Sequence, residues 1–423
     1  MSTFVVYGNF IFTSSPHTFV AKEKAYLVIE NGVVLLLADE LPEQYEGLAV
    51  MDFSEELIIP GFCDLHTHAP QFVQCGLGYD EELLPWLTKY TFPLESRFSD
   101  LEFADRCYRE FIRALWVSGT TRASVFGTLH PDTTLLLFDL LVKSGLGGMV
   151  GKVNMDRNSI PELSETTAES LRDTELFLSR TLGRNNRVTP ILTPRFVPST
   201  TRELMRELGH LAETYNLPIQ SHVSENRDEV AWVRELHPEI ETFSEVYEAY
   251  VLLRPEKTVL AHAIYLTEKE KILLQERKIY LAHCPLSNIN MRSGIMPLRE
   301  YMRRDMRLGI GSDVAGSHRL DIMSSIAGAC QQSNLRFIDH PEDIPVSLSE
   351  AFYLATKGGG KFFGRVGSFE PGYDADFLVI NKEKDNVLLP RTLEERLSQF
   401  IYSADTSSIS KRFVQGREIT CPA

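Results

Sequence analysis

The sequence predicts an α/β protein built on a (β/α)8 TIM barrel, with a smaller β-rich unit formed by both chain ends. Eight short apolar runs alternate with helix-like stretches between residues 56 and 364. Residues 1–55 and 365–423 instead hold runs of β-branched and aromatic residues. No Gly-x-Gly-x-x-Gly follows the first apolar run, which disfavours the alternative of a doubly wound nucleotide-binding sheet.

The first β-rich segment contains three strand-like runs, at residues 4–12, 25–38 and 48–53. Asn31-Gly32 interrupts the second run, and this dipeptide favours a hairpin because both residues tolerate positive φ. The last 60 residues hold two similar runs, DADFLVINKE at 374–383 and KRFVQGREI at 411–419. We expect the two chain ends to pair in one small β unit.

The central region supplies the barrel. Helical periodicity, with apolar residues three and four positions apart, occurs for example at 101–119, 200–215 and 267–277. Strands are predicted at 56–66, 121–127, 148–156, 187–196, 218–225, 258–265, 278–285 and 307–313.

Polar side chains mark six of the eight predicted strand ends. In a (β/α)8 barrel, these ends meet on one face and form the active site. A single histidine at such a place is usually a hydrogen-bonded core residue, but six marked ends together indicate a site. The residues are His66 and His68, Arg195 and Phe196, His222 and Glu225, His262, His283, and Asp313.

His66 and His68 lie two residues apart on the first strand, so both side chains point to the same face. With His222 and Asp313 they offer three imidazole nitrogens and one carboxylate oxygen, which suits Zn²⁺, and imidazole also suits iron. A divalent metal held there can lower the pKa of water from 15.7 to about 7. We therefore predict a hydrolytic metal site with an open position for water.

Glu225 lies three residues after His222 and can move protons to and from the activated water. The alternative is an ordinary acidic residue at the start of the helix NRDEVAWVREL. One metal is predicted, because Arg195 ends the fourth strand, where a two-metal barrel commonly needs a bridging lysine. Lys152 is the competing lysine, and a packing or charge role is the preferred interpretation.

Composition narrows the remaining classes. The net charge is −15 and the pI is about 5.3, which argues against a nucleic-acid or anionic-membrane partner. Apolar runs are too short to span a bilayer, and MSTFVVYGNF lacks the basic start of a signal peptide. Six scattered cysteines without a Cys-x-x-Cys pair favour a reduced, cytoplasmic protein. Cys63, Cys75 and Cys284 are interpreted as packing residues.

Several motifs resemble the amidohydrolase superfamily: PGFCDLHTH, SHVSE, LAH, AHCP and GSD. The C-terminal segments GSFEPGYDADFLVINK and FVQGREI resemble the end of its composite β-sandwich, completed by the N-terminal strands. Within the superfamily, HAPQ, LPWLTKYTFPLESRF, TPRF, QSHVSENRDEV and GSDVAG resemble the guanine deaminases. The resemblance covers nearly the whole chain. It implies a sandwich from residues 1–55 and 365–423 around a catalytic barrel at 56–364.

The resemblance also implies residue roles and a reaction. One Zn²⁺ per chain is expected, with Fe²⁺ left open, and guanine and water would react to form xanthine and ammonia. A homodimer is expected, while His283 receives no role. Ala263 stands where relatives often carry glycine. The implied metal ligands are His66, His68, His222 and Asp313; the catalytic residues are Glu225, His262 and Asp313; and the substrate-binding residues are Gln71, Arg195, Phe196, His222, Glu225 and Asp313.

Two rival functions are left open. One is a deaminase or chlorohydrolase acting on another ring, such as a pterin, a triazine or an adenosine derivative. The other is an inactive scaffold that works through protein contacts, although such a chain would be expected to lose metal ligands. In the long segment after the first strand, Trp86 and Phe92 either cap the substrate or pack the outer layer of the barrel.

Overall fold

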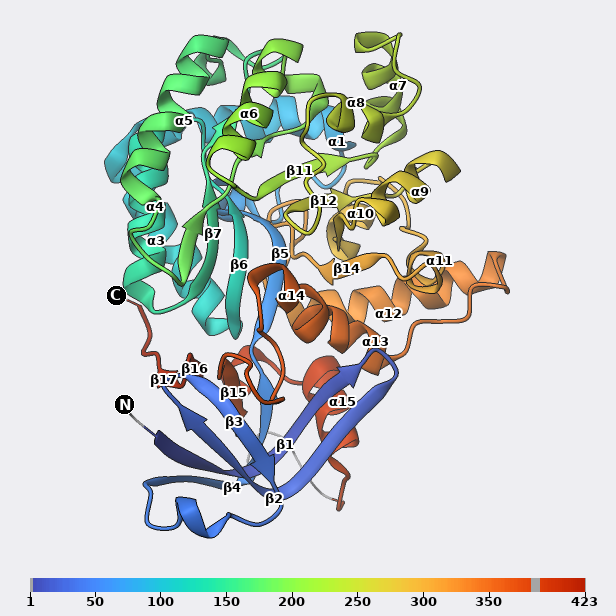
Figure 1. The fold of residues 1–423 in the computed structure, drawn as a ribbon. Helices are drawn as coiled ribbons and strands as arrows, with labels where there is room; N and C mark the ends of the chain where they lie inside the picture. Colours follow the sequence, from blue (N-terminus) through green and yellow to red (C-terminus); the bar gives the residue numbers. More distant parts are fainter. Residues whose placement is uncertain (1–2, 382–388, 423) are drawn as a thin grey trace.

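The computed structural model describes residues 3–381 and 389–422, so Lys382 and Glu383 of one predicted strand lie outside the described residues. Figure 1 shows parallel strands surrounded by helices in the upper part and a sheet in the lower part. Both labelled chain ends lie near that lower sheet. Within residues 3–381 and 389–422, no helix combines the length and apolar composition needed to cross a bilayer.

The lower sheet has seven strands and combines both ends of the chain in the order β17-β16-β15-β4-β1-β2-β3. Asn31 and Gly32 adopt φ values of 52° and 85° between β2 and β3, which pair antiparallel as the predicted hairpin. The strands are β1 Thr3–Ser15, β2 Thr18–Glu30, β3 Val33–Ala38, β4 Val50–Pro60, β15 Phe377–Ile380, β16 Ile409–Val414 and β17 Arg417–Glu418.

The upper part contains parallel strands in two four-stranded sheets, β5-β6-β7-β9 and β11-β12-β13-β14, and the short pair β8–β10. Each of the eight predicted runs overlaps at least one of the observed parallel strands, and the first run also includes the end of β4 in the lower sheet. Their bounds are β5 Phe62–His68, β6 Thr120–Phe126, β7 Gly147–Gly151, β8 Val153–Asn154, β9 Val188–Pro190, β10 Thr193–Pro194, β11 Ile219–Val223, β12 Thr258–His262, β13 Tyr280–His283 and β14 Arg307–Ile310.

Backbone hydrogen bonds join the two four-stranded sheets on both sides. On one side, the N–H of Gln220, on β11, donates at 2.9 Å to the carbonyl of Leu192, which lies two residues after β9. On the other side, Asp313 N–H donates to the His66 carbonyl at 2.8 Å, and His68 N–H donates to the Val314 carbonyl at 3.3 Å. The ends of β5 and β14 are therefore neighbours, which places His66 beside Asp313.

Helices follow most of the parallel strands and cover them (Figure 1). Asp100 begins α3 by accepting hydrogen bonds from the N–H groups of Glu102 and Phe103, a standard N-cap. The helices are α1 Leu83–Trp86, α2 Phe92–Ser96, α3 Leu101–Val117, α4 Pro131–Ser144, α5 Thr167–Thr181, α6 Arg202–Thr214, α7 Arg227–Leu236, α8 Phe243–Ala249, α9 Glu268–Glu276, α10 Pro285–Asn290, α11 Leu298–Arg303, α12 Ile322–Asp339, α13 Leu348–Tyr353, α14 Gly359–Phe363 and α15 Leu393–Ser403.

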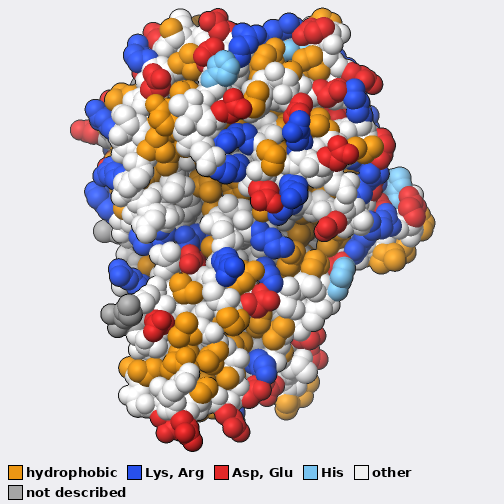
Figure 2. All heavy atoms as spheres, viewed as in Figure 1, with side chains coloured by type: hydrophobic (Ala, Val, Ile, Leu, Met, Phe, Trp, Pro, Cys, Tyr) orange, Lys and Arg blue, Asp and Glu red, His pale blue; other side chains and the backbone are white. Residues whose placement is uncertain are grey.

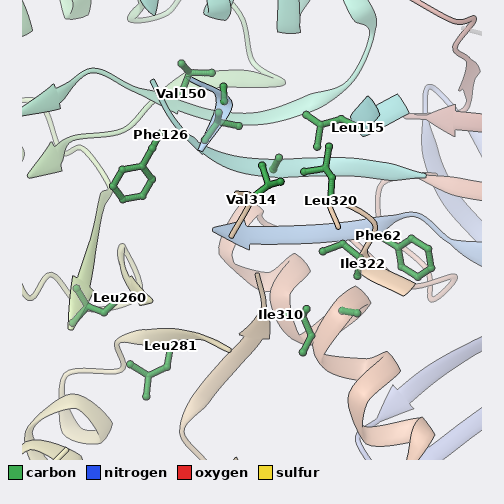
Figure 3. Packing of buried hydrophobic residues seen from close by; sticks show 14 of the residues in the cluster. Phe62, Leu115, Phe126, Val150, Leu260, Leu281, Ile310, Val314, Leu320 and Ile322 are labelled. Carbon is green, nitrogen blue, oxygen red and sulfur yellow. The ribbon is translucent and has the colours of Figure 1, made fainter. Parts of the chain in front are cut away.

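The main apolar core lies between these helices and the parallel strands. Figure 3 shows Phe126, Leu281 and Ile310 within it, and all three side chains are fully buried. Burying an apolar side chain of this size contributes about 1.5–3 kcal/mol. The core therefore holds the strands rigidly, so that side chains at their ends have fixed positions.

Candidate active site

His66 and His68 project from the end of β5 to the same side, as expected for residues two apart on a strand. Their Nε2 atoms lie 3.2 Å apart. Both side chains are almost completely buried. Two imidazole nitrogens this close can bind one cation together.

Two residues from distant parts of the chain complete the cluster. The Nε2 atom of His222, on β11, lies 3.2 Å from Nε2 of His68. Asp313 follows β14, and its Oδ1 atom lies 3.2 Å from Nε2 of His66 and 3.4 Å from Nε2 of His68. Ligands of a tetrahedral zinc, bound at about 2.0–2.2 Å, are about 3.3–3.6 Å apart. Four of the six distances among the predicted ligand atoms are therefore close to those around one tetrahedral metal ion.

The protonation of the imidazoles also suits a metal. Nδ1 of His222 lies 2.5 Å from the backbone carbonyl of Arg195, so Nδ1–H donates and the Nε2 lone pair faces the cluster. Burial lowers the pKa of His68 to about 4 and holds the pKa of His222 well below its usual value. Both rings are thus neutral at pH 7, the form that binds metals.

His262 and Glu225 lie beside this cluster. Nε2 of His262 is 3.3 Å from Glu225 Oε2 and 3.7 Å from Asp313 Oδ2, while its Nδ1 is 2.9 Å from Asn288 Oδ1. Ser293 donates a hydrogen bond to Glu225 Oε1 at 3.2 Å. The two carboxylates and the imidazole therefore surround one small volume.

The two carboxyl groups have opposite proton affinities. Burial, together with the negative charge of Asp313, raises the pKa of Glu225 well above its usual value. Burial also disfavours the charge on Asp313, but the charge and hydrogen bond of His66, with the hydrogen bond of His68, outweigh it and hold the pKa of Asp313 well below its usual value. Such a pair divides into a group that holds a proton at rest and a group that is ionised at rest, as acid–base catalysis requires.

Left-handed backbone at several strand ends directs these side chains. His262 and Ala263 have φ values of 75° and 48°, and Asp313 has a φ of 48°. Residues with a side chain rarely adopt positive φ, so this geometry is typical of functional sites. Glycine adopts this conformation more easily than alanine, so Ala263 is held there by its surroundings.

His283 is brought near His262 but has no assigned function. Burial, aided by the charge of His262, lowers the pKa of His283 to about 3. Its Nδ1 atom is buried and has no hydrogen-bond partner among the described residues.

One cavity opens at the cluster, and its wall includes Gln71, Arg195, Phe196 and Trp86. Trp86 thus lines the cavity, and its Nε1–H donates to the Leu77 carbonyl at 2.9 Å. Phe92 instead packs behind this wall, where its ring centre lies 5.2 Å from the Arg195 guanidinium carbon. Of the two aromatic candidates, Trp86 therefore lines the cavity, whereas Phe92 is a packing residue behind its wall.

The sequence reasoning missed Glu95, which lies on α2 behind the cavity. Its carboxylate accepts hydrogen bonds from both terminal nitrogens of Arg195 and from Nε2 of Gln71. The motif LPWLTKYTFPLESRF contained this residue, but nothing local distinguishes it from a surface acid.

It also missed Asp64, on β5, whose carboxylate accepts from the backbone N–H groups of His66 and Ser312 and from the Ser312 hydroxyl. Burial raises the pKa of Asp64 to about 7. Asp64 thus joins the strand that carries two histidines to the segment that carries Asp313.

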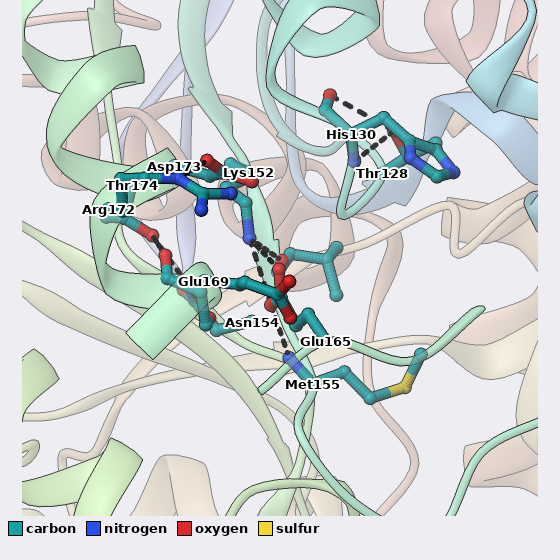
Figure 4. A network of polar contacts seen from close by, with 12 residues as sticks. Thr128, His130, Lys152, Asn154, Met155, Glu165, Glu169, Arg172, Asp173 and Thr174 are labelled. Atoms are coloured by element: carbon teal, nitrogen blue, oxygen red, sulfur yellow. Dashed lines mark hydrogen bonds and ion pairs between the residues drawn. The ribbon is translucent and has the colours of Figure 1, made fainter. Parts of the chain in front are cut away.

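The hydrogen bonds of Lys152 go to Val153 and Glu165 and not to the predicted metal ligands. Figure 4 shows its ammonium group directed at Glu165, with Nζ 2.7 Å from Oε2, and both side chains are buried. Lys152 also donates to the Val153 carbonyl at 3.0 Å. These contacts agree with the interpretation of Lys152 as a charge partner.

A larger cavity, of about 720 Å³, lies away from the cluster against Tyr280, Arg307 and Lys361. Figure 2 shows Lys and Arg side chains across the middle of one face of the molecule. Arg307 pairs with Glu256, and Lys361 donates to the Tyr353 hydroxyl. The cavity walls contain no histidine–carboxylate cluster like that at the strand ends.

Comparisons with known proteins converge on one family. The family model described as "Amidohydrolase family" matches residues 57–419. Guanine deaminase of Dictyostelium discoideum is 38% identical over 399 residues, covering 92% of this chain and 88% of its own length. The enzyme of Rattus norvegicus is 40% identical over 377 residues, covering 86% and 83%. The crystal structure of guanine deaminase from C. acetobutylicum, with guanine bound in its active site, matches this structure with a TM-score of 0.97 at 43% identity. The match covers 99% of this chain and 100% of that chain.

Proposed function

The chain belongs to the amidohydrolase family, and we propose that it is a guanine deaminase that hydrolyses guanine to xanthine and ammonia. The observation that carries the proposal is the convergence of four ligand atoms, from His66, His68, His222 and Asp313, beside the proton-holding carboxyl of Glu225. Such a cluster suits hydrolysis at an activated carbon. The identity of 35–40% with curated guanine deaminases over most of the chain supports guanine as the substrate.

The cavity suits a flat, neutral heterocycle. Arg195 supplies N–H donors for the purine oxygen and ring nitrogens, and the Phe196 side chain offers an aromatic face. Phe196 is itself held by an edge contact with Trp232, at 6.4 Å between ring centres. A purine lying along this wall would place C2 toward His262 and Asp313.

The four clustered ligands fit one divalent metal, which supplies Lewis-acid activation of water when bound. Glu225 delivers its proton to the ring nitrogen next to C2 as water adds to that carbon. It then takes a proton from the added water and passes it to the leaving amine. Asp313, ionised at the start, accepts the other proton of that water and returns it to Glu225 once the amine has left, while His262 donates a hydrogen bond to the oxygen that forms at C2. Ammonia leaves, and the ring retains the oxygen as xanthine.

The finer features belong to the same proposal. The metal is one Zn²⁺ per chain, supported by three nitrogens and one oxygen at tetrahedral spacings. The parallel strands form a closed eight-stranded barrel at residues 56–364, supported by the backbone bonds at Gln220 and Asp313. Residues 1–55 and 365–423 form a separate β domain, supported by the strand order of the seven-stranded sheet, and β4 extends that sheet to Pro60.

Location and assembly are also proposed. A reducing, cytoplasmic location is supported by six free cysteines. A homodimer is supported by apolar side chains exposed at the end of α12 and in the segment after it, where Ile338 is 72% and Ile344 is 66% exposed. Solution mass measurements on wild type and Ile338→Asp test the dimer.

A substrate panel tests the function. Guanine, a pterin, an aminotriazine and adenosine are offered to the purified protein, and ammonia release is measured. We expect kcat/KM for guanine to exceed that of each other ring at least a hundredfold. A clear preference for one of the other rings would replace guanine deaminase with the rival deaminase function.

A further inference from the structure

We infer that Gln71 meets the purine as a hydrogen-bond acceptor, through its side-chain carbonyl, and that Glu95 is the positioning residue that fixes this orientation. The inference rests on the proposed function and names the polarity of one wall of the same cavity. The sequence alone placed Gln71 among the substrate-binding residues without fixing which end of its amide faces the purine.

The evidence begins with the contacts of Glu95, whose side chain is 2% exposed. Nη1 of Arg195 donates to Glu95 Oε2 at 2.5 Å, and Nη2 donates to Oε1 at 3.1 Å. Nε2 of Gln71 donates to the same Oε1 at 3.0 Å. One buried carboxylate therefore holds two residues of the cavity wall.

The direction of the Gln71 amide follows from chemistry. A guanidinium has donors only, so both oxygens of Glu95 act as acceptors toward Arg195. If the amide were turned over, its carbonyl oxygen would face a carboxylate oxygen at 3.0 Å, and two acceptors would repel each other. The NH2 group must therefore face Glu95, a direction fixed by the hydrogen-bond network.

The carbonyl oxygen of Gln71 is then available on the other side of the amide. Among the described residues, none donates a hydrogen bond to it, and Gln71 lines the cavity beside Arg195. An acceptor on this wall needs a ligand N–H. Guanine has ring N–H groups at N1 and in its five-membered ring, next to its acceptors O6, N3 and N7.

Charge balance supports the same arrangement. The Arg195 guanidinium is 3% exposed, and its charge is matched by Glu95 at equal burial. Two of its five N–H groups bind Glu95, which leaves three for a ligand. The wall thus offers donors from Arg195 and an acceptor from Gln71 without net charge, which fits a neutral purine better than an anion.

The position of Glu95 is itself secured. Helix α2, which carries Glu95, packs against the 3₁₀ turn at Pro161–Leu163. The segment after that turn is tied down by Glu165, which accepts from Lys152 and from the Met155 N–H at 3.2 Å (Figure 4). The buried Lys152–Glu165 pair thus supports the helix from which Glu95 acts.

A reciprocal exchange tests the inference. Gln71→Glu alone places two carboxylates side by side, and Glu95→Gln alone leaves the Arg195 charge unmatched; each should lower kcat/KM for guanine at least a hundredfold. The double variant, Gln71→Glu with Glu95→Gln, again places a donor opposite an acceptor between positions 71 and 95, keeps the net charge, and keeps an acceptor toward the purine. It gives up one of the two hydrogen bonds from Arg195, because an amide has a single acceptor oxygen, so the recovery is partial. We expect it to recover at least tenfold over the poorer single variant, mainly through KM.

A glutamate at position 71 cannot donate, so a double variant as inactive as Gln71→Glu would overturn the acceptor role. Metal content and Tm are measured on all variants, because a purely structural role of Glu95 would move Tm and kcat/KM together. Equal losses of Tm and activity, without recovery in the exchange, would remove Glu95 as a positioning residue.

If the charged variants fail to fold, a binding measurement on wild type and one further variant tests the inference instead, and it needs no turnover. Calorimetry with hypoxanthine, 1-methylhypoxanthine and 9-methylhypoxanthine is run on wild type and on Gln71→Met, which keeps the side-chain length without polar donors. We expect one methylated ligand to lose at least fivefold more affinity on wild type than on Gln71→Met. Equal losses on both proteins, or no binding of hypoxanthine to wild type, would contradict the inference. Absence of guanine turnover with intact hypoxanthine coupling would instead count against the proposed reaction alone.

Discussion

The carboxylate of Asp64 accepts two hydrogen bonds from Ser312, one from its backbone N–H at 2.9 Å and one from its hydroxyl at 2.5 Å. The same carboxylate accepts from the His66 N–H at 3.1 Å. Asp64 lies two residues before one predicted ligand, and Ser312 lies immediately before another, Asp313. This contact sets the separation of the segment that carries His66 from the segment that carries Asp313.

Asp64→Ala removes the acceptor and leaves two buried N–H groups without partners. Each such group costs about 1–3 kcal/mol, and supports of this kind are typically worth 10–100-fold in metal affinity. We expect the variant to lose metal to a competing chelator at least tenfold more readily than wild type. Asp64→Asn, which keeps one acceptor oxygen, is the matched control and should lie between them. Wild-type metal retention in Asp64→Ala would remove this role.

Glu225→Gln tests the proton carrier. The amide has nearly the same shape but cannot exchange a proton, and general acid–base catalysis is typically worth about 10²–10⁴-fold. We expect wild-type metal content and a kcat reduced at least a hundredfold. Stopped-flow or ammonia-release assays and metal analysis on one preparation check both parts. An active Glu225→Gln enzyme would show that another group moves the proton, and His262 is the neighbouring candidate.

Lys152→Met tests the one-metal prediction. Removing one partner of a buried ion pair leaves Glu165 unmatched, which costs about 3–5 kcal/mol. We expect a lower urea midpoint and an unchanged metal-to-protein ratio in the folded protein. Adding Glu165→Leu removes the unmatched charge and should recover part of the stability. A fall from two metals per chain to one would identify Lys152 as a bridging ligand.

His237 predicts a pH dependence of stability outside the active site. Burial, with the positive charges of Arg202 and Arg157, lowers the pKa of His237 to about 4. The folded chain keeps this ring neutral while the unfolded chain protonates it near pH 6.5, so its stabilising effect is lost as pH falls from about 6.5 to 4. The expected loss is at most about 3 kcal/mol.

Urea unfolding of wild type and His237→Gln at pH 8, 6 and 4.5 measures this effect. The glutamine variant should be the less stable protein at pH 8 and should lose less stability on acidification. Parallel pH profiles of the two proteins would show that another group controls the acid sensitivity.

Much of the fold and site was readable in the sequence because the signals are local. Period-two spacing placed His66 and His68 on one face, and six of the eight predicted strands ended in a chemically marked residue. Glu95 was missed because its partners Gln71 and Arg195 lie 24 and 100 residues away, and a glutamate in a short helix looks like a solvated one. The polarity that Gln71 presents to a ligand could not be read from the sequence either, because the orientation of an amide depends on that distant partner.

The most direct test of the account is xanthine formation from guanine by the purified protein, with metal content measured on the same sample. The account predicts steady turnover with about one zinc per chain, and loss of both zinc and turnover in His68→Ala. Bound zinc without xanthine formation would contradict the substrate. A metal-free protein that remains inactive after zinc is added would contradict the metal-dependent hydrolase itself.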